Sequence, residues 1–206
     1  MDFREKIAAL KEQKRAVILA HYYTSAEVQQ VADFVGDSLA LSQKAAGVDA
    51  DIILFAGVRF MAETAKVLSP DKKVLLPVTE AGCSLADSCD AAELAKARRE
   101  NPDHLVVSYV NTSVEVKALT DICCTSSNAL DIIGALPKDQ KILFVPDRNL
   151  GSYINRCMER DMKLWNGCCL VHEEFSVEKI AALKALHPKA VVLVHPECKP
   201  EVVAMA

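Results

Sequence analysis

Acid–base and hydrogen-bonding side chains follow three apolar runs of this sequence at nearly regular intervals. They are His21 and Tyr23, Tyr109 and Asn111, and His195 and Glu197. The first residues of the three pairs are separated by 88 and then 86 residues. A single histidine or tyrosine in such a place is usually an ordinary surface residue, but three equivalent places favour a common site. Histidine, tyrosine and glutamate can together move protons near neutral pH when burial and neighbouring charges adjust their pKa values.

Hydroxyl side chains stand where two helices are expected to begin. Gly36-Asp37-Ser38 opens one helix, and Thr125-Ser126-Ser127-Asn128 opens another directly after a strand. Free backbone N–H groups and hydroxyls at a helix N-terminus can bind a phosphate or a carboxylate without a lysine. Ordinary capping needs only one such residue, and consecutive hydroxyls exceed that need. The pattern leaves capping and anion binding both open, with Ser38 and Ser126 among the candidates.

Two of the eight cysteines lie in similar Gly-Cys loops. Cys83 and Cys169 are 86 residues apart, and another step of the same length predicts a third cysteine near position 255, beyond residue 206. Three thiolates related in this way would hold three irons of a cubane cluster and leave the fourth iron open to substrate. Buried thiols are the other interpretation of any one cysteine. We assign the cysteines outside the pattern to packing: Cys89, Cys123, Cys124, Cys157 and Cys198.

Short apolar runs alternate with helical patterns along the chain, which is typical of an α/β fold with parallel sheets. The expected strands are 16–20, 52–55, 74–76, 105–109, 121–123, 142–145 and 191–194. The expected helices are 3–13, 26–34, 60–68, 90–99, 113–119, 127–135 and 176–186. Thr24 and Glu27 predict a capping box at the second helix. Ligands bind beyond the carboxyl ends of parallel strands, where the six polar side chains stand.

The order of helix, strand and polar strand end occurs three times. The sequence therefore predicts tandem three-layer αβα domains with parallel sheets, related by pseudo-threefold symmetry. The first domain covers residues 1–82 and the second 83–169, and an incomplete third domain covers 170–206.

Composition excludes several classes of protein. Hydrophobic residues make up 51% of the 206 residues, and the net charge is −4. Because basic residues form no stripe, we expect no nucleic acid partner. No apolar run reaches the roughly 18 residues of a membrane span, and the charged start of the chain is not a signal peptide. We expect a cytoplasmic protein with reduced thiols.

An ordered set of motifs resembles the quinolinate synthase family and covers essentially the whole chain. The motifs are His21–Tyr23, Ala32–Leu39, Gly57–Lys66, Ala81–Asp87, Tyr109–Ser113, Cys124–Ala129, Pro146–Gly151, Trp165–His172 and His195–Cys198. The resemblance implies three α/β domains around a [4Fe–4S] cluster. It also implies condensation of iminoaspartate with dihydroxyacetone phosphate to quinolinate, with loss of phosphate and water. Iminoaspartate would be supplied by an aspartate oxidase or dehydrogenase.

The resemblance also assigns roles to residues. Cys83 and Cys169 resemble two cluster ligands, and Cys169 is preferred over Cys168 because it stands three residues before His172. The acid–base set implied is Tyr23 and Glu197 with the two histidines, His21 and His195. The implied substrate-binding set is His21, Ser38, Tyr109, Asn111, Ser126, His195 and Glu197.

Three alternatives or departures remain at this stage. The family continues beyond His195-Pro196-Glu197-Cys198 to a further anion loop and the third cysteine, so we expect the 206-residue form to be truncated and inactive as it stands. Another [4Fe–4S]-dependent hydro-lyase would share the open iron without needing a phosphate site. A non-catalytic metal-binding scaffold would use the thiols structurally, and substitution of Glu197 would then have no chemical effect.

Overall fold

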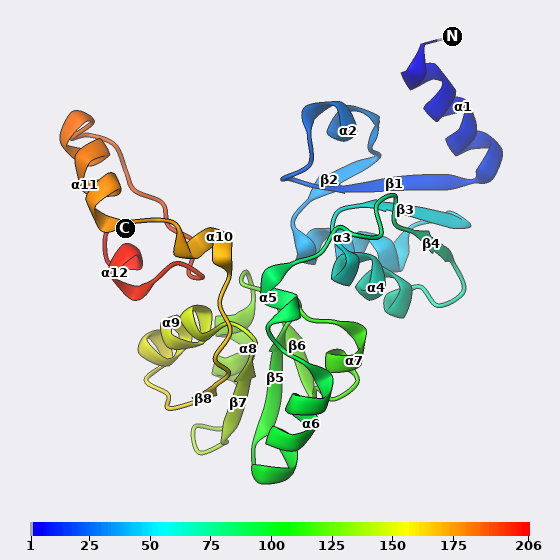
Figure 1. Cartoon of the computed structure of the whole chain (residues 1–206). Helices are drawn as coiled ribbons and strands as arrows, with labels where there is room; N and C mark the ends of the chain where they lie inside the picture. The colour runs from blue at the N-terminus through cyan, green and yellow to red at the C-terminus, as the bar shows by residue number, and fades with distance from the viewer. Residues whose placement is uncertain (1) are drawn as a thin grey trace. The chain divides into compact units, whose positions relative to one another are not determined.

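The structure, a computed structural model, describes residues 2–206, which form two compact units, Met1–Cys83 and Ser84–Ala206 (Figure 1). Each unit contains a four-stranded sheet whose neighbouring strands are all parallel. The strand orders are β2-β1-β3-β4 and β6-β5-β7-β8. The predicted α/β class with tandem αβα layers is therefore confirmed.

The helices of the first unit cover both faces of its sheet (Figure 1). Its elements are α1 (Phe3–Lys14), β1 (Ala16–His21), α2 (Ala26–Val31), β2 (Phe34–Gly36), α3 (Ser38–Gly47), β3 (Ile52–Ala56), α4 (Arg59–Leu68) and β4 (Lys73–Leu75). Leu19, Ile53 and Phe55 are fully buried on the face covered by α3 and α4. Because successive strand residues point to opposite faces, Ile18, Ile52 and Leu54 face α1 and α2.

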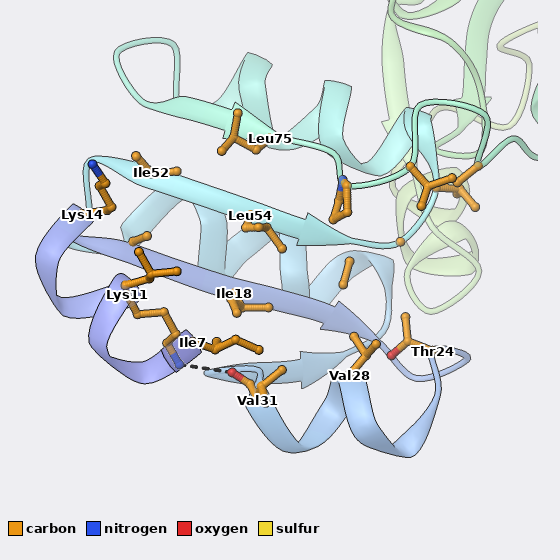
Figure 2. A pocket seen from close by; sticks show the side chains of 18 of the residues that line it. Ile7, Lys11, Lys14, Ile18, Thr24, Val28, Val31, Ile52, Leu54 and Leu75 are labelled. Atoms are coloured by element: carbon orange, nitrogen blue, oxygen red, sulfur yellow. Dashed lines mark hydrogen bonds between the residues drawn. The ribbon is translucent and has the colours of Figure 1, made fainter. Parts of the chain in front are cut away.

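That second face carries an apolar hollow of about 730 Å³ (Figure 2). Ile18, Ile52 and Leu54 form its floor, and side chains of α1 and α2 line its side. Neither α1 nor α2 buries any residue completely, so the two helices cover this face only in part. Lys11 lies at its edge, where its Nζ donates to the carbonyl oxygen of Val31 at 3.2 Å.

The second unit has the same sheet arrangement. The strands of its sheet and the helices between them are α5 (Ser84–Asp87), α6 (Ala91–Glu100), β5 (Leu105–Tyr109), α7 (Val114–Lys117), β6 (Ile122–Cys124), α8 (Ala129–Ala135), β7 (Ile142–Val145), α9 (Arg148–Met158) and β8 (Lys163–Leu164). Three short helices follow: α10 (Leu170–Glu173), α11 (Val177–Leu186) and α12 (Pro200–Val203). Leu94 of α6 packs on Val106 and Leu143 of the sheet, and all three are buried. Helices α8 and α9 contact each other, and α9 lies against β7 and β8.

An aspartate at the start of an outer strand links helix and sheet in both units. Asp33 accepts a backbone N–H from β1 at 2.8 Å and pairs with Lys11 at 2.7 Å. Asp121 accepts a backbone N–H from β5 at 2.8 Å and pairs with Arg98 at 2.6 Å. The repeated order of the sequence therefore corresponds to a repeated structure, down to single hydrogen bonds.

Two local predictions near the first strand end are wrong. Ser25 is the N-cap residue of helix α2, and its side chain makes no capping hydrogen bond. Thr24 does not form the predicted capping box, because its hydroxyl donates to the carbonyl oxygen of His21 at 2.8 Å. The same helix ends at Val31, not at residue 34, because Phe34–Gly36 pairs with β1 as strand β2. The short strand β8 and helix α9 were also absent from the prediction.

The predicted strand 191–194 is wrong as well. Its residues form no strand, since no described strand pairs with them, and Leu193 is 92% exposed. Helix α11 buries none of its residues. The chain then packs against the core of the second unit, where Cys198 and Val202 are buried. The proposed third domain stays a prediction.

No helix in the described part of the chain combines the length and the apolar character needed to cross a membrane.

Leu94 offers a test of the core of the second unit. Because its side chain is fully buried, we expect Leu94→Ala to lower the free energy of unfolding by about 2–5 kcal/mol through lost burial and a residual cavity. The matched control is Leu186→Ala, a residue that is 74% exposed, with an expected change within about 0.5 kcal/mol. Urea unfolding followed by circular dichroism measures both, and equal losses in the two variants would contradict this core.

Candidate active site and metal-binding residues

Glu197 is a buried acidic side chain at the centre of the second unit's candidate site. It is 3% exposed, and its Oε1 accepts a hydrogen bond from the hydroxyl of Tyr109 at 2.6 Å. Its Oε2 lies 3.3 Å from Nδ1 of His172. Burial alone raises the pKa of the Glu197 carboxyl, but His172 and Tyr109 outweigh burial and lower it. The carboxylate is therefore ionised at neutral pH, and burial with that carboxylate nearby raises the pKa of Tyr109 well above 10.

His195 and Ser126 lie beside this carboxylate. Nε2 of His195 is 3.3 Å from the hydroxyl oxygen of Ser126, and Nδ1 is 3.7 Å from Oε1 of Glu197. Nδ1 also accepts the backbone N–H of Glu197 at 3.3 Å. Burial lowers the pKa of His195, so the ring is neutral at pH 7, and acceptance at Nδ1 places its proton on Nε2. His195 thus presents an N–H donor toward Ser126.

Cys169 and His172 stand on one turn at the start of α10. Cys169 is the N-cap of this helix, and residues three apart on a helix share a face. Ligand atoms of Cys169, His172 and Glu197 all lie within 4.8 Å of one another. Nδ1 of His172 is buried and makes no hydrogen bond among the described residues, while it lies 3.3 Å from Oε2 of Glu197 as an ion-pair neighbour. These three side chains could hold a metal ion.

The loop that carries Cys169 is held against β7 by a close backbone approach. Arg148 N–H donates to the carbonyl oxygen of Gly167 at 2.8 Å, and Gly167 N–H donates to that of Pro146 at 3.1 Å. A Cβ atom on Gly167 would lie 2.5 Å from the Pro146 oxygen. Only glycine fits this approach, which explains the glycine before the cysteine pair.

Two side chains at the N-terminus of α9 support the site, and the residue patterns alone did not identify them. Asp147, fully buried, accepts the backbone N–H groups of Asn149 and Leu150 at 2.8 Å each. Burial raises its pKa to about 6, and Leu150 N–H, Asn149 N–H and Cys169 N–H each act to lower it. The side-chain amide of Asn149 donates to the carbonyl oxygen of Glu197 at 3.0 Å and to Oε1 of Glu173 at 2.9 Å. An Asp-x-Asn sequence after a buried strand was the available signal.

Asn111 follows Tyr109 beyond the end of β5. Its Oδ1 atom is buried and has no hydrogen-bond partner within the described chain. A buried amide oxygen without a partner is uncommon and often marks a place where another molecule or water completes the bonding. The position is compatible with the predicted substrate-binding role, which stays a prediction.

The first unit groups the other predicted residues at the end of β1. Nδ1 of His21 accepts the backbone N–H of Tyr23 at 3.4 Å, the same arrangement that His195 has with Glu197. Burial lowers the pKa of His21, and Asp37 acts in the opposite direction. The Tyr23 hydroxyl donates to the sulfur of Met61 at 3.4 Å. Burial and then the charge of Cys83 raise the pKa of Tyr23 to about 12.

Ser38 is the first residue of α3, directly after Asp37. The Asp37 carboxylate accepts the backbone N–H of Ala40 at 2.8 Å, so it caps the helix and leaves the Ser38 hydroxyl out of that cap. The ten predicted site residues therefore fall into two groups. His21, Tyr23, Ser38 and Cys83 lie in the first unit, and Tyr109, Asn111, Ser126, Cys169, His195 and Glu197 in the second.

Two sequence interpretations need correction here. Helix α8 begins at Ala129, later than predicted, because Asn128 Oδ1 accepts the backbone N–H of Thr125 at 2.7 Å and closes a turn before it. The packing role is wrong for Cys123 and Cys157, which are exposed. Cys89, Cys124 and Cys198 are buried as predicted.

Asn149 can be tested against a matched residue of the same helix. Asn149→Ala removes two hydrogen bonds and leaves the buried carbonyl of Glu197 unpaired, so we expect a loss of about 1–3 kcal/mol and faster amide exchange in residues 195–203. Asn155→Ala also removes two bonds, both to Met162. Hydrogen exchange should stay slow at 195–203 in that variant. Equal exchange in the two variants would argue against the positioning role of Asn149.

The pKa of His172 gives a second test. The neighbouring Cys169 and Glu197 raise it to about 10, so His172 should remain protonated through neutral pH. Its contribution to stability is complete below the ordinary value of 6.5 and is lost as the pH rises through about 10. In Glu197→Gln the pKa should fall, and the titration of His21 in the other unit should not change. NMR titration of the histidine ring protons measures both, and a His172 transition below pH 7 in the unmodified chain would contradict this geometry.

Comparison with known proteins agrees with the motifs. The family model for the quinolinate synthetase A protein matches residues 5–206. Quinolinate synthase of Synechocystis sp. is 57% identical over 198 residues, which are 96% of this chain and 62% of that protein. Quinolinate synthase of Microcystis aeruginosa is 54% identical over 205 residues, and that of Nostoc sp. is 55% identical over 206 residues.

Both of the latter matches cover the whole of this chain and 64% of the relative. The chain thus spans a little under two thirds of the length of these curated relatives. A family match over nearly every residue, with the motif side chains gathered at strand ends, leads to one conclusion: the chain belongs to the quinolinate synthetase A family.

Proposed function

We propose that this chain contributes to a quinolinate synthase, which condenses iminoaspartate with dihydroxyacetone phosphate to quinolinate and releases phosphate and water. Its family membership and the names of its relatives support the proposal. The observation that carries it is the group of Tyr109, Ser126, His195 and Glu197 beside Cys169 in the second unit. It offers acid–base groups, hydroxyl donors and a free thiol in one place.

Proton transfer is assigned to Tyr23, His21, His195 and Glu197. Glu197 is ionised and enclosed, so it can accept a proton from a reacting carbon or nitrogen atom. His195 is neutral and presents its Nε2–H, which suits donation to a leaving hydroxyl or to a developing oxyanion. A pKa of about 12 keeps Tyr23 protonated at neutral pH, so its hydroxyl acts first as a donor.

Anion binding is assigned to neutral donors. In both histidines the backbone N–H at Nδ1 directs the ring proton to Nε2, so His21 and His195 can each donate to a carboxylate or phosphate oxygen. The hydroxyls of Ser38, Ser126 and Tyr109 and the side chain of Asn111 complete the proposed substrate-binding set. The role of Ser126 is supported by its contact with His195. It is not argued from the N-terminus of α8, because this helix has only seven residues.

We assign the cofactor as a [4Fe–4S] cluster with Cys83 and Cys169 among its ligands and a third cysteine expected beyond residue 206. Both cysteines are outside any disulfide and only partly buried, and each stands beside proposed catalytic groups of its own unit. These features fit metal ligands better than core thiols. When bound, such a cluster supplies a Lewis acid that polarises a hydroxyl group of the substrate.

The supply of substrate, the cellular location and a third domain follow from the same proposed enzyme. An aspartate oxidase or dehydrogenase would supply iminoaspartate, which hydrolyses readily in water. A cytoplasmic location agrees with eight cysteines outside any disulfide and with the reducing conditions that such thiols need. A third α/β domain starting near residue 170 agrees with the exposed apolar side chains of Leu186, Val191 and Leu193.

The decisive experiment joins the chain at residue 206 to the remaining part of the Synechocystis relative, which the cysteine spacing predicts to lie C-terminal. We expect the anaerobically reconstituted fusion to form quinolinate from iminoaspartate and dihydroxyacetone phosphate, measured by liquid chromatography. Dihydroxyacetone should not replace its phosphate ester. Turnover of the unphosphorylated compound at the same rate would favour a different cluster-dependent hydro-lyase.

Glu197 decides between catalysis and a structural scaffold. In the fusion, Glu197→Gln should lower kcat by about 100-fold or more, with a smaller change in KM, because it removes the enclosed base. The matched control is Glu174→Gln, an exposed glutamate of the same unit, which should retain activity. Unchanged kcat in Glu197→Gln, with an unchanged unfolding transition, would refute the acid–base assignment.

A further inference from the structure

Three chemically different ligands converge in the second unit without help from the rest of the chain. Sγ of Cys169, a ring nitrogen of His172 and a carboxylate oxygen of Glu197 lie within 4.8 Å of one another. Ligands at 2.0–2.3 Å from a tetrahedral Zn²⁺ are about 3.3–3.8 Å apart, so small side-chain rotations bring the three atoms to coordinating distance. We propose that these residues form a mononuclear site for a divalent transition-metal ion of the Zn²⁺ class.

The surroundings hold the ligands in place, and a divalent ion would bind by displacing the proton that His172 carries beside Glu197. Oε1 of Glu197 is bound by Tyr109 at 2.6 Å, which leaves Oε2 facing His172 at 3.3 Å. The Glu197 carbonyl is held by Asn149 at 3.0 Å. Nδ1 of His172 is buried without a hydrogen-bond partner in the described part of the chain. Hydrogen bonds from Tyr109 and Asn149 thus fix the orientation of Glu197, as neighbouring groups commonly do for the ligands of a metal ion.

The ligand set decides the class of ion. One thiolate, one imidazole and one carboxylate suit Zn²⁺, Co²⁺ or Fe²⁺, whereas Mg²⁺ and Ca²⁺ prefer oxygen ligands alone. Three protein ligands leave a fourth tetrahedral position for water, as in catalytic zinc sites. The charges of a thiolate and a carboxylate balance a divalent ion, which reduces the cost of enclosing Glu197 at 3% exposure.

This site has a consequence for the proposed enzyme, although it does not depend on the proposed reaction. Cys169 is the proposed cluster ligand and Glu197 the proposed base, and a single ion in the site occupies both. An ion bound before cluster assembly therefore blocks loading of the cluster and removes the acid–base group at once. Zn²⁺ and the cluster exclude each other at this place.

Cobalt substitution tests the site in the 206-residue chain, kept reduced and anaerobic. Titration with Co²⁺ should give the intense visible bands of tetrahedral cobalt and a thiolate-to-cobalt charge-transfer band, both saturating at one ion per chain. Because Zn²⁺ binds such ligands more tightly than Co²⁺, one equivalent of Zn²⁺ should remove both signals. Cys169→Ser should abolish the charge-transfer band, and His172→Gln should weaken Co²⁺ binding by about 10-fold or more.

The adjacent thiol provides the matched control. Cys168→Ser should leave the Co²⁺ spectrum and affinity unchanged, as should replacement of the exposed Cys123 and Cys157. Circular dichroism confirms that each variant is folded, and His172→Gln keeps the test decisive if Cys169→Ser is not. Weak octahedral bands, or a charge-transfer band that survives in Cys169→Ser and disappears in Cys168→Ser, would overturn the site. The cobalt titration needs neither the cluster nor the substrates. Its failure is therefore distinguishable from a failure of the fusion to form quinolinate.

Discussion

The buried carboxylate of Glu197 is the constraint on which the second unit's site depends. Removing a carboxylate from water costs several kcal/mol unless hydrogen bonds and opposite charge compensate. Here Tyr109 donates from a strand end 88 positions earlier in the chain, at 2.6 Å, and His172 lies on the other side. These contacts fix the segment around residue 197 against the sheet. The same contacts keep the carboxylate ionised, so the interaction that fixes the fold also sets the chemistry of the site.

The N-terminus of α9 connects the two loops that meet at this carboxylate. Asp147 caps the helix, and the backbone beside it binds the Gly167 loop that carries Cys169. Two residues later, Asn149 binds the carbonyl of Glu197. Both loops are therefore hydrogen-bonded to the same N-terminal end of α9, which follows strand β7. A thiol and a carboxylate from distant parts of the chain keep a fixed separation because they share this support.

Sequence reasoning found the elements and side chains that follow from periodicity, and missed those that depend on long-range packing. Buried parallel strands can be recognised as apolar runs, and the residues that follow them meet at one edge of the sheet, which explains the place of Tyr109. Glu197 is predicted at the same site, but it follows a run that forms no strand and reaches Tyr109 by a long-range contact. The run at 191–194 has the same composition but no described strand to pair with, and composition cannot supply a partner. His172 and Asn149 act through contacts across the fold, and no local spacing encodes such contacts.

Equivalent strand ends in the two units carry different side chains in different surroundings. His21 pairs with Gly36 across β1 and β2, and Tyr109 pairs with Cys124 across β5 and β6, so the two side chains occupy the same place in equivalent sheets. Tyr109 is 6% exposed, whereas His21 remains half-buried and Tyr23 is 58% exposed.

The sheets cannot cause this difference in exposure, because their order and direction are the same. It comes from residues 195–202, which bring Glu197, Cys198 and Val202 onto the second sheet's end and bury them there. Enclosure converts a polar strand end into a site with shifted pKa values. In the second unit, a segment outside the repeated sheet, and not the sheet itself, therefore encloses the acid–base groups.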